Sequence, residues 1–503
     1  MSNTPTPTSQ ALRWSRFALS AVAIASLSAC ANFSGIFSSA KPVAAQQAGL
    51  STQAIPADSV ALDSQWWKAY GDEQLNQLVD KALANNPSLR VAQARVQRVM
   101  AGIDNAEAAS APQVNASLDA THQLYTRNGL VPAPIAGSER EIGTLQLSGN
   151  WELDLFGKNR AALDAAIGQS RAAQADAQAA RMLLASNVAR NYFQWMRVQG
   201  QLEVAQRTLA QREQTRQLVK DRLQAGLDTQ LELQQSESAL PDARFQIEAL
   251  KEQEALLLNA LRALTAQQNT TLALVNRAPS AINSVANAQT KVQTVPLDLL
   301  GRRADVVAAR WRVEAATRDV DNAKTLFYPN INLSAFAGFS SIGFDKLVQS
   351  SSAQWGVGPA IRLPLFEGGR LRANLKGKTA DLDAAIETYN AAVVDAVRDV
   401  ADQLASTQAI ERQQVEQKAA QQSAETAYTI AVQRYEAGLG NYLNVLNAET
   451  AVLTQRKLGV DLAARSVDTQ LQLIRALGGG FTDTDTSTHT APVSYTHLRA
   501  HET

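Results

Sequence analysis

The stretch Thr144-Leu-Gln-Leu-Ser-Gly-Asn-Trp-Glu-Leu-Asp-Leu155 alternates apolar and polar residues without a break. Its odd-numbered positions carry Leu, Gly or Trp, and its even-numbered positions carry Thr, Gln, Ser, Asn, Glu or Asp. Because successive side chains of a strand point to opposite faces, the pattern predicts a strand with one apolar and one polar face. Such a strand is either half-buried in a protein core or has lipid on one side and water on the other.

Three other segments show the same alternation, namely Val114–Thr121, Ile331–Phe339 and Trp355–Leu363. Every charged residue inside the four segments falls on the polar phase: Asp119, Glu152, Asp154 and Arg362. A charge on the apolar phase would be costly against lipid or a protein core, so this distribution supports the strand assignment. The sequence therefore predicts four amphipathic strands in two pairs.

The chain also repeats itself over most of its length. Three pairs of motifs align at offsets of 210, 217 and 212 residues: Leu153–Phe156 with Leu363–Phe366, Ala111–Asn115 with Tyr328–Asn332, and Arg222–Leu227 with Arg434–Leu439. Offsets this similar indicate an internal duplication. The predicted repeats are 72–265 and 297–481, and a linker rich in Ser, Asn, Ala and Thr, 266–296, joins them.

Each repeat is predicted to run helix, strand hairpin, very long helix, tight turn and returning helix. The predicted helices are 73–109, 160–224 and 229–264 in the first repeat, and 297–326, 370–436 and 441–477 in the second. At 1.5 Å per residue the longest would span about 100 Å, too much for a compact domain. Their Ala- and Gln-rich composition favours coiled-coil-like packing, so the fold class is mainly α with a small β part.

The N-terminus predicts a signal peptide over residues 1–29. Arg13 and Arg16 precede an uncharged apolar run, Phe17–Leu27. A basic segment followed by a short apolar segment is typical of a secretory signal. The run is too short to cross a bilayer as a helix, because a membrane span needs about 20 residues.

The apolar run ends at Leu27-Ser28-Ala29-Cys30, which resembles the bacterial lipobox. Cys30 is the only cysteine of the chain and lies at the one position where a lipoprotein needs it. We therefore expect Cys30 to be acylated, with residues 30–71 forming the lipid anchor and an extended segment. The alternative is an ordinary signal peptide whose cysteine happens to lie near the cut.

Composition excludes several classes of protein. The 503 residues include one cysteine, four histidines, and 47 basic against 47 acidic side chains. One cysteine excludes an intrachain disulfide framework and a multi-cysteine metal site, and the balanced charge argues against a nucleic-acid partner. With few histidines and no P-loop, the sequence offers no catalytic constellation. We predict a protein that is not an enzyme and has no metal or cofactor besides the covalent lipid on Cys30.

Residues 482–503 are predicted to be a disordered tail. Its last eleven residues, Val493–Thr503, match one reading frame of a sequencing adaptor and are predicted to be an artefact. His497 and His501 in this segment are therefore not interpreted as metal ligands.

Four strands cannot close a barrel on their own, because transmembrane barrels begin at about eight strands. An open sheet in lipid would leave backbone groups unpaired at several kcal/mol each. If the strands lie in a membrane, copies of the chain must assemble to close the sheet. A dimer would give eight strands with a filled interior, and a trimer twelve strands with a lumen.

Motifs along residues 60–481 resemble the outer membrane factor family of TolC-like channels. The motifs are Trp66-Trp67 with Asp72, Asn85-Asn86-Pro87, Arg303-x-Asp305-Val306, Phe327-Tyr328-Pro329, Pro364–Arg370 and Ala476–Gly480. The chain is most similar to the outer membrane efflux lipoproteins that work with resistance-nodulation-division pumps.

The resemblance implies a homotrimer with a transmembrane twelve-stranded β-barrel, lipid-anchored in the cell outer membrane and continued by a periplasmic α-barrel. It implies the outer membrane channel of a tripartite efflux system, a passive conduit for drugs and small toxic compounds. The implied partners are a periplasmic adaptor protein, an inner-membrane pump and outer membrane lipid. The alternative is a periplasmic coiled-coil adaptor or scaffold lipoprotein without a pore. Trp66 and Trp67 are interpreted as packing residues, with partner recognition as the alternative.

In this family the two helix turns form the periplasmic tip, here Arg222–Leu231 and Arg434–Leu443. The resemblance implies adaptor contact at Arg222, Gly226, Leu227, Arg434, Gly438 and Leu439, and an aperture lined by Glu232, Gln235, Asn444 and Asn447. Asn447 replaces the family's usual aspartate, which puts an electrostatic cation gate in doubt. The two arginines could equally complement the helix dipole at a C-terminus.

Overall fold

The computed structural model describes residues 33–43, 63–267, 274 and 299–481. The signal peptide, Cys30, most of the predicted linker and the tail 482–503 lie outside the described residues. The chain groups into two compact units. The sheet unit comprises Met1–Pro42, Arg95–Ala173 and Ala309–Tyr389, and the tip unit comprises Val43–Ala94, Gln174–Ala308 and Asn390–Thr503.

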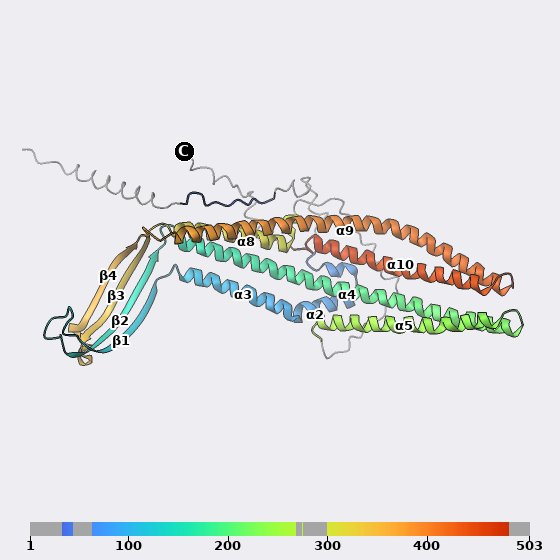
Figure 1. Ribbon diagram of the computed structural model, residues 1–503, viewed down its shortest axis with the longest axis horizontal. Coiled ribbons are helices and arrows are strands. Elements are labelled where there is room, and N and C mark those ends of the chain that lie inside the picture. The colour runs from blue at the N-terminus through green and yellow to red at the C-terminus, as the bar shows by residue number, and fades with distance from the viewer. Residues whose placement is uncertain (1–32, 44–62, 268–273, 275–298, 482–503) are drawn as a thin grey trace, which may run out of the picture. The chain divides into compact units, whose positions relative to one another are not determined.

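The sheet unit contains one antiparallel four-stranded sheet, whose strands lie side by side in Figure 1. Its strands in spatial order are β1 (Gln113–Leu124), β2 (Glu139–Leu153), β3 (Asn330–Ile342) and β4 (Ala353–Arg362). The central pair, β2 with β3, joins the first half of the chain to the second. The two outer strands, β1 and β4, are therefore the edges of the sheet.

The observed register places the predicted apolar rows on one face. Leu147 on β2 lies opposite Ala116 on β1 and Ala337 on β3. Ala337 in turn lies opposite Trp355 on β4. The intervening residues, such as Gln146, belong to the other face because side chains alternate along a strand. The prediction of four amphipathic strands is confirmed.

Two strands end earlier than predicted, while the other strand ends extend past the predicted segments. β2 ends at Leu153, so Asp154 and Leu155 belong to the connection that follows it. The Asp154 carboxylate instead accepts a hydrogen bond from the backbone N–H of Arg160 at 2.9 Å, which satisfies one of the unpaired donors at a helix start. β4 likewise ends before Leu363.

The predicted helix 73–109 is wrong in one respect, because it is two helices. They are α2 (Glu73–Asn85) and α3 (Pro87–Ala108), separated by Asn86 in an extended conformation. Pro87 causes the break, because a proline disfavours the helical conformation of the residue before it. The Asn86 side chain secures the break by accepting from the Ser88 N–H and donating to the Leu264 carbonyl, each at 2.8 Å.

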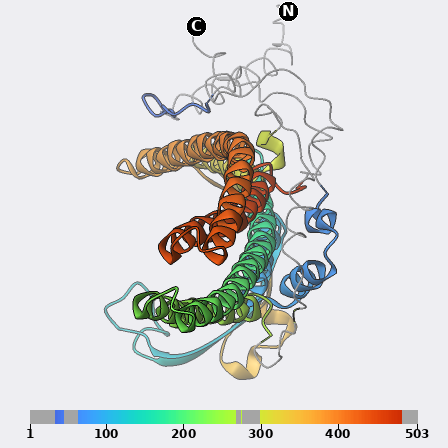
Figure 2. The same cartoon turned by 90° about the vertical axis from the view of Figure 1, so that its right-hand side faces the viewer.

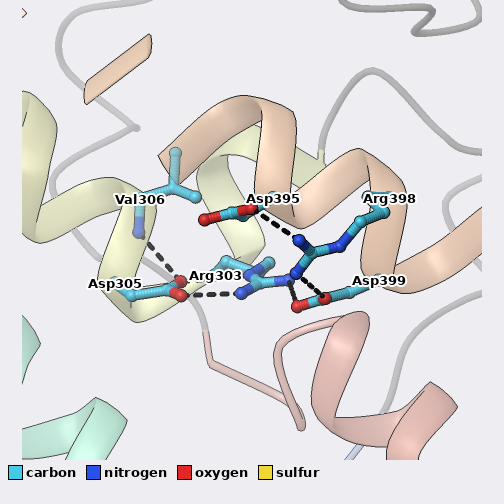
Figure 3. Close-up of polar contacts among 6 residues, drawn as sticks. All are labelled: Arg303, Asp305, Val306, Asp395, Arg398 and Asp399. Carbon is cyan, nitrogen blue, oxygen red and sulfur yellow. Dashed lines mark hydrogen bonds and ion pairs between the residues drawn. The ribbon is translucent and has the colours of Figure 1, made fainter. Parts of the chain in front are cut away.

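The predicted helix 297–326 is also broken, into α7 (Leu299–Arg302) and α8 (Ala304–Thr325). No proline follows this break, and an ion-pair cluster lies there instead (Figure 3). Arg303 donates to Asp305 at 2.7 Å and to Asp399 on α9 (Arg370–Glu436) at 3.1 Å. The pKa of Asp305 is lowered, since the favourable bonds from Arg303 outweigh the opposing effect of burial. Two carboxylates therefore hold the residue at which the helix is interrupted.

The long helices agree with the prediction to within two residues. α4 (Lys158–Gln224) and α9 (Arg370–Glu436) have 67 residues each, and α5 (Gln230–Leu264) and α10 (Tyr442–Ala476) have 35 each. At 1.5 Å per residue, a 67-residue helix is about 100 Å long. Among the described residues, none of the helices combines the length and apolarity needed to cross a bilayer.

Trp66 and Trp67 are core residues of the tip unit. Both are buried in a cluster that includes Tyr192, and their own rings meet edge to face at 5.7 Å between centroids. The Tyr192 hydroxyl donates to Asp72 at 2.7 Å, and Asp72 also caps the start of α2. The packing interpretation of the Trp pair is confirmed.

Candidate partner-binding site at the helix turns

The first hairpin of the tip unit turns between α4 and α5. Gly226 has a φ of 73°, which L residues with a side chain rarely adopt. The N–H groups of Gly226 and Leu227 donate to the carbonyls of Leu223 and Arg222, the pair of bonds that closes a Schellman motif. Thr229 then caps α5, in a capping box with Glu232.

The second hairpin turns between α9 and α10 with the same backbone. Gly438 also has a φ of 73°, and the N–H of Leu439 donates to the Arg434 carbonyl at 2.7 Å. Asn441 caps α10 by accepting from the backbone N–H of Asn444 at 3.1 Å. Figure 2 shows both hairpins from their turns.

A buried charge cluster joins the first hairpin to α9. Arg222 donates from Nε to Asp228 at 3.0 Å and from Nη1 to the Tyr435 carbonyl at 2.9 Å. Its guanidinium also lies 4.5 Å from the centre of the Tyr435 ring. The Tyr435 hydroxyl donates to the same Asp228 carboxylate. The Arg222 and Asp228 side chains are only 11% and 8% exposed, so this ion pair lies inside the tip.

Arg222 and Tyr435 both keep their protons at neutral pH. The hydrogen bond to Asp228 raises the pKa of Arg222. Burial, followed by the bond to Asp228, raises the pKa of the Tyr435 hydroxyl. Tyr435 therefore remains a hydrogen-bond donor well into the alkaline range.

The second turn has a different arrangement of charge. Arg434 is the repeat counterpart of Arg222, but Gly440 stands where the first turn has Asp228. The Arg434 side chain is exposed and donates to the Leu439 carbonyl at 3.3 Å. The arginine of the second turn thus faces solvent, whereas the arginine of the first is bound internally.

Five of the six predicted contact residues lie on the surface of the turns: Gly226, Leu227, Arg434, Gly438 and Leu439. Arg222 does not. Two further leucines, Leu231 and Leu443, join Leu227 and Leu439 in exposing more than half of their surface. Large apolar side chains gathered on an exposed turn favour contact with another protein.

The four predicted aperture residues lie in the first turns of the returning helices. Glu232 and Gln235 are half-buried on α5, while Asn444 and Asn447 are exposed on α10. Glu232 is engaged by the cap: hydrogen bonds from the Thr229 hydroxyl, its own backbone and the Thr229 backbone lower its pKa. Of these four residues only Glu232 is charged, and its carboxylate is already hydrogen-bonded in the cap of α5.

Sequence reasoning missed Asp228 and Tyr435 as members of the tip. A usable signal exists in the comparison of the repeats, where Asp228 aligns with Gly440 and Tyr435 with Leu223. Where equivalent positions of the two repeats carry different residue types, the side-chain contacts of the two turns are expected to differ. Within the described residues, no group of His, Cys, Asp and Glu side chains is arranged to hold a metal ion.

Known proteins resemble this chain along most of its length. The family described as outer membrane efflux protein matches residues 78–267 and 295–479. The multidrug resistance outer membrane protein MdtQ of Escherichia coli O157:H7 is 34% identical over 432 residues, which cover 83% of this chain and 88% of the relative. Outer membrane protein OprJ of Pseudomonas aeruginosa is 31% identical over 480 residues, covering 93% and 97% of the two chains.

Solved structures agree with these relatives. The outer membrane protein VceC of Vibrio cholerae superposes with a TM-score of 0.75 at 34% identity, over 84% of this chain and all of that one. The outer-membrane channel OprN superposes with a TM-score of 0.77 at 26% identity, over 89% and 98%. Together with the family match, these similarities show that the chain belongs to the outer membrane efflux protein family, whose members are conduits rather than enzymes.

Proposed function

We propose that this chain is the outer membrane channel of a tripartite efflux system, a passive duct for drugs and small toxic compounds. Membership of the efflux family and the name of the relative MdtQ support export across the outer membrane as its task. The observation that carries the proposal is a four-stranded sheet with one apolar face, one polar face and two edge strands.

The edge strands require other copies of the chain. Within the described residues, β1 and β4 each pair on one side only. In lipid such edges would leave backbone donors and acceptors unsatisfied, at several kcal/mol each. A homotrimer supplies twelve strands, which closes the sheet and leaves a lumen.

The two faces of the sheet suit lipid outside and water inside. Residues of the polar face include Asn115, Ser117, Thr144, Gln146, Ser148, Asn150, Ser334 and Ser340. Short neutral polar side chains can line a water-filled pore without binding a passing compound tightly. The 67-residue helices α4 and α9 would continue the duct as a periplasmic α-barrel.

The segment after the proposed lipid anchor is tied to the sheet unit. Phe33 packs edge to face on Phe327, with 5.0 Å between ring centroids. Asp383 accepts from the Ser38 hydroxyl at 2.5 Å and from the Ala40 N–H at 3.3 Å. Cys30, which lies outside the described residues, precedes Phe33 by three residues in the sequence. The contacts support a lipid anchor that enters the membrane beside the sheet.

The turns are the proposed contact with a periplasmic adaptor and, through it, an inner-membrane pump of the resistance-nodulation-division type. Exposed Leu227 and Leu439 would supply apolar contacts, and Arg434 a charged one. Arg222, bound inside the tip, would instead hold the hairpins together until a partner engages. With Asn444 and Asn447 on α10, we do not propose a carboxylate ring as a cation gate.

The repeated order of elements supports the two-repeat division at 72–265 and 297–481. Both halves contain a 67-residue helix followed by a 35-residue helix. A pore-free periplasmic scaffold is the less favoured function, because it would leave the apolar sheet face without lipid to cover it.

Sedimentation of the full-length protein in detergent tests the proposal. We expect a trimer that cannot be extracted from membranes without detergent. A monomer or dimer released by salt alone would favour the scaffold. Cys30→Ser tests the anchor separately: we expect loss of acyl labelling, and retained labelling would refute acylation at this residue.

A further inference from the structure

An aromatic stack holds the junction between the two halves of the sheet unit. Phe156, which follows β2, stacks on Tyr328, which precedes β3. The ring centroids are 5.0 Å apart and the planes differ by 10°. The stack therefore adds a side-chain contact at the same boundary that the β2–β3 ladder crosses.

A hydrogen bond between helices holds the same junction. Asn322 on α8 donates from Nδ2 to the carbonyl of Lys158, the first residue of α4, at 2.8 Å. The first half thus supplies the Phe156 ring and the Lys158 carbonyl. The second half supplies the Tyr328 ring that stacks on the first and the Asn322 amide that donates to the second.

The repeat provides a counterpart for each part of this junction. At the offset of 210, Phe156 corresponds to Phe366. Lys158, the first residue of α4, corresponds to Arg370, the first residue of α9, because the two 67-residue helices align at an offset of 212. At the offset of 217, Tyr328 corresponds to Ala111 and Asn322 to Asn105. Within the described chain the counterparts do not meet, because Phe366 and Arg370 follow one edge strand, β4, while Asn105 and Ala111 precede the other, β1.

The counterparts are displayed at the surface. Phe366 is 92% exposed and its neighbour Leu365 78% exposed, and Asn105 is also exposed. At the internal junction the ring of Phe156, which follows β2, contacts Tyr328, two residues before the start of β3, the next strand in sheet order. The same step taken from β4 leads past the edge of the sheet, where the β1 strand of another copy would lie if the copies close the sheet in the same order.

We propose that the internal junction is repeated between copies of the chain. Phe366 of one copy packs on the Ala111–Pro112 turn of the next copy, and Asn105 of that next copy donates to the Arg370 carbonyl at the start of α9. The inference rests on the proposed self-association and adds the side-chain contacts that align the protomers.

The receiving turn has a surface suited to a ring. Trp151 donates from its indole N–H to the Ser110 carbonyl at 3.0 Å, which keeps an aromatic side chain against the turn. Ala111 replaces the bulky Tyr328 of the internal junction and leaves room there. An offset or edge-to-face contact between Phe366 and Trp151 would then be available.

Photo-crosslinking tests the contact directly in the full-length protein. With p-benzoylphenylalanine at position 366, we expect covalent dimers and trimers whose crosslinked peptide contains the Ala111–Pro112 turn. The same probe at position 156 is the matched control, and it should react within its own chain, close to Tyr328. A trimeric protein in which the probe at 366 reacts only with its own chain or with lipid would overturn the inference.

Dissociation of the trimer provides a second measurement. We expect Phe366→Ala to raise the fraction of dissociated protomer about tenfold at a fixed denaturing temperature, as for loss of a buried aromatic anchor at an interface. Phe344→Ala, which removes an exposed ring from the β3–β4 connection, should leave this fraction unchanged. If the unmodified protein sediments as a monomer, the proposed function fails; if it is trimeric and Phe366→Ala behaves like Phe344→Ala, only this inference fails.

Discussion

The two helix turns have the same backbone conformation, but their equivalent arginines lie in different surroundings. Gly226 and Gly438 share a φ of 73° and the same pair of turn hydrogen bonds. In the first turn the arginine is buried against Asp228 and Tyr435, whereas in the second Arg434 is exposed. The two turns therefore share the geometry that reverses the chain and differ in the residues that surround the arginine.

The different surroundings of the two arginines indicate a different role for each turn. The first turn is fastened to α9, because Asp228 accepts from both Arg222 and Tyr435. The second turn has no such carboxylate and presents an arginine beside exposed Leu439. We infer that the first turn keeps the hairpins together and that the second is the more accessible to a partner.

Asp228→Asn should have the largest effect on this difference. The substitution leaves the Arg222 guanidinium buried without a carboxylate, which costs about 3 kcal/mol when a buried pair is broken. We expect faster amide hydrogen exchange in the first turn and in the facing part of α9. Asp221→Asn, at an exposed site in the last turn of α4, is the control and should leave exchange unchanged.

Gly226→Ala and Gly438→Ala should cost similar amounts, about 1 kcal/mol each, because both force a side chain into the left-handed region. A side chain would meet no neighbouring atom at either position, so strain is the only expected penalty. Exchange rates of the turn amides check the pair. Unequal effects would show that the two backbones are not equivalent.

Tyr435→Phe should remove one hydrogen bond, worth about 1 kcal/mol, and keep the ring under Arg222. Because the pKa of Tyr435 is raised in the folded tip, the unfolded state loses this proton first as pH rises. The stabilisation is therefore complete below about pH 10 and declines above it. The protection of the first-turn amides against hydrogen exchange should therefore decrease with pH in this range in the unmodified protein, and should change less in Tyr435→Phe.

Gly440→Asp should have the smallest effect on stability, below about 1 kcal/mol, because it creates an exposed pair with Arg434. A side chain at this position has room, since its Cβ would lie 3.6 Å from the nearest atom of Arg434. We expect weaker binding of the cognate adaptor, measured by co-purification, with little change in melting temperature. Unchanged binding would argue against a role of Arg434 in partner contact.

The regular parts of the fold were predictable from local pattern. Alternation over Thr144–Leu155 predicted β2, and the absence of helix breakers predicted 67-residue helices to within two residues. The helix break at Asn86 was also available in principle, because Pro87 follows it. The break at Arg303 was not, since it coincides with ion pairs to carboxylates, one of them 96 residues away.

The positions of the two helix turns were predictable from the sequence, but the hydrogen bonds and ion pairs within them were not. The repeat and the family resemblance pointed to Arg222 and Arg434 as equivalent contacts. Whether an arginine is buried depends on partners distant in sequence, and Tyr435 lies 207 residues from Asp228. Sequence periodicity carries no information about such distant pairs. We therefore predicted the same partner contact for both arginines, whereas Arg222 is bound internally and Arg434 is exposed.

Ion conductance of the purified full-length protein in planar lipid bilayers tests the trimeric duct most directly. We expect discrete but small conductance steps from the unmodified trimer, because its hairpins are held together at the first turn. Asp228→Asn, which loosens that turn, should give larger steps. A trimeric preparation in which neither protein conducts would contradict the duct.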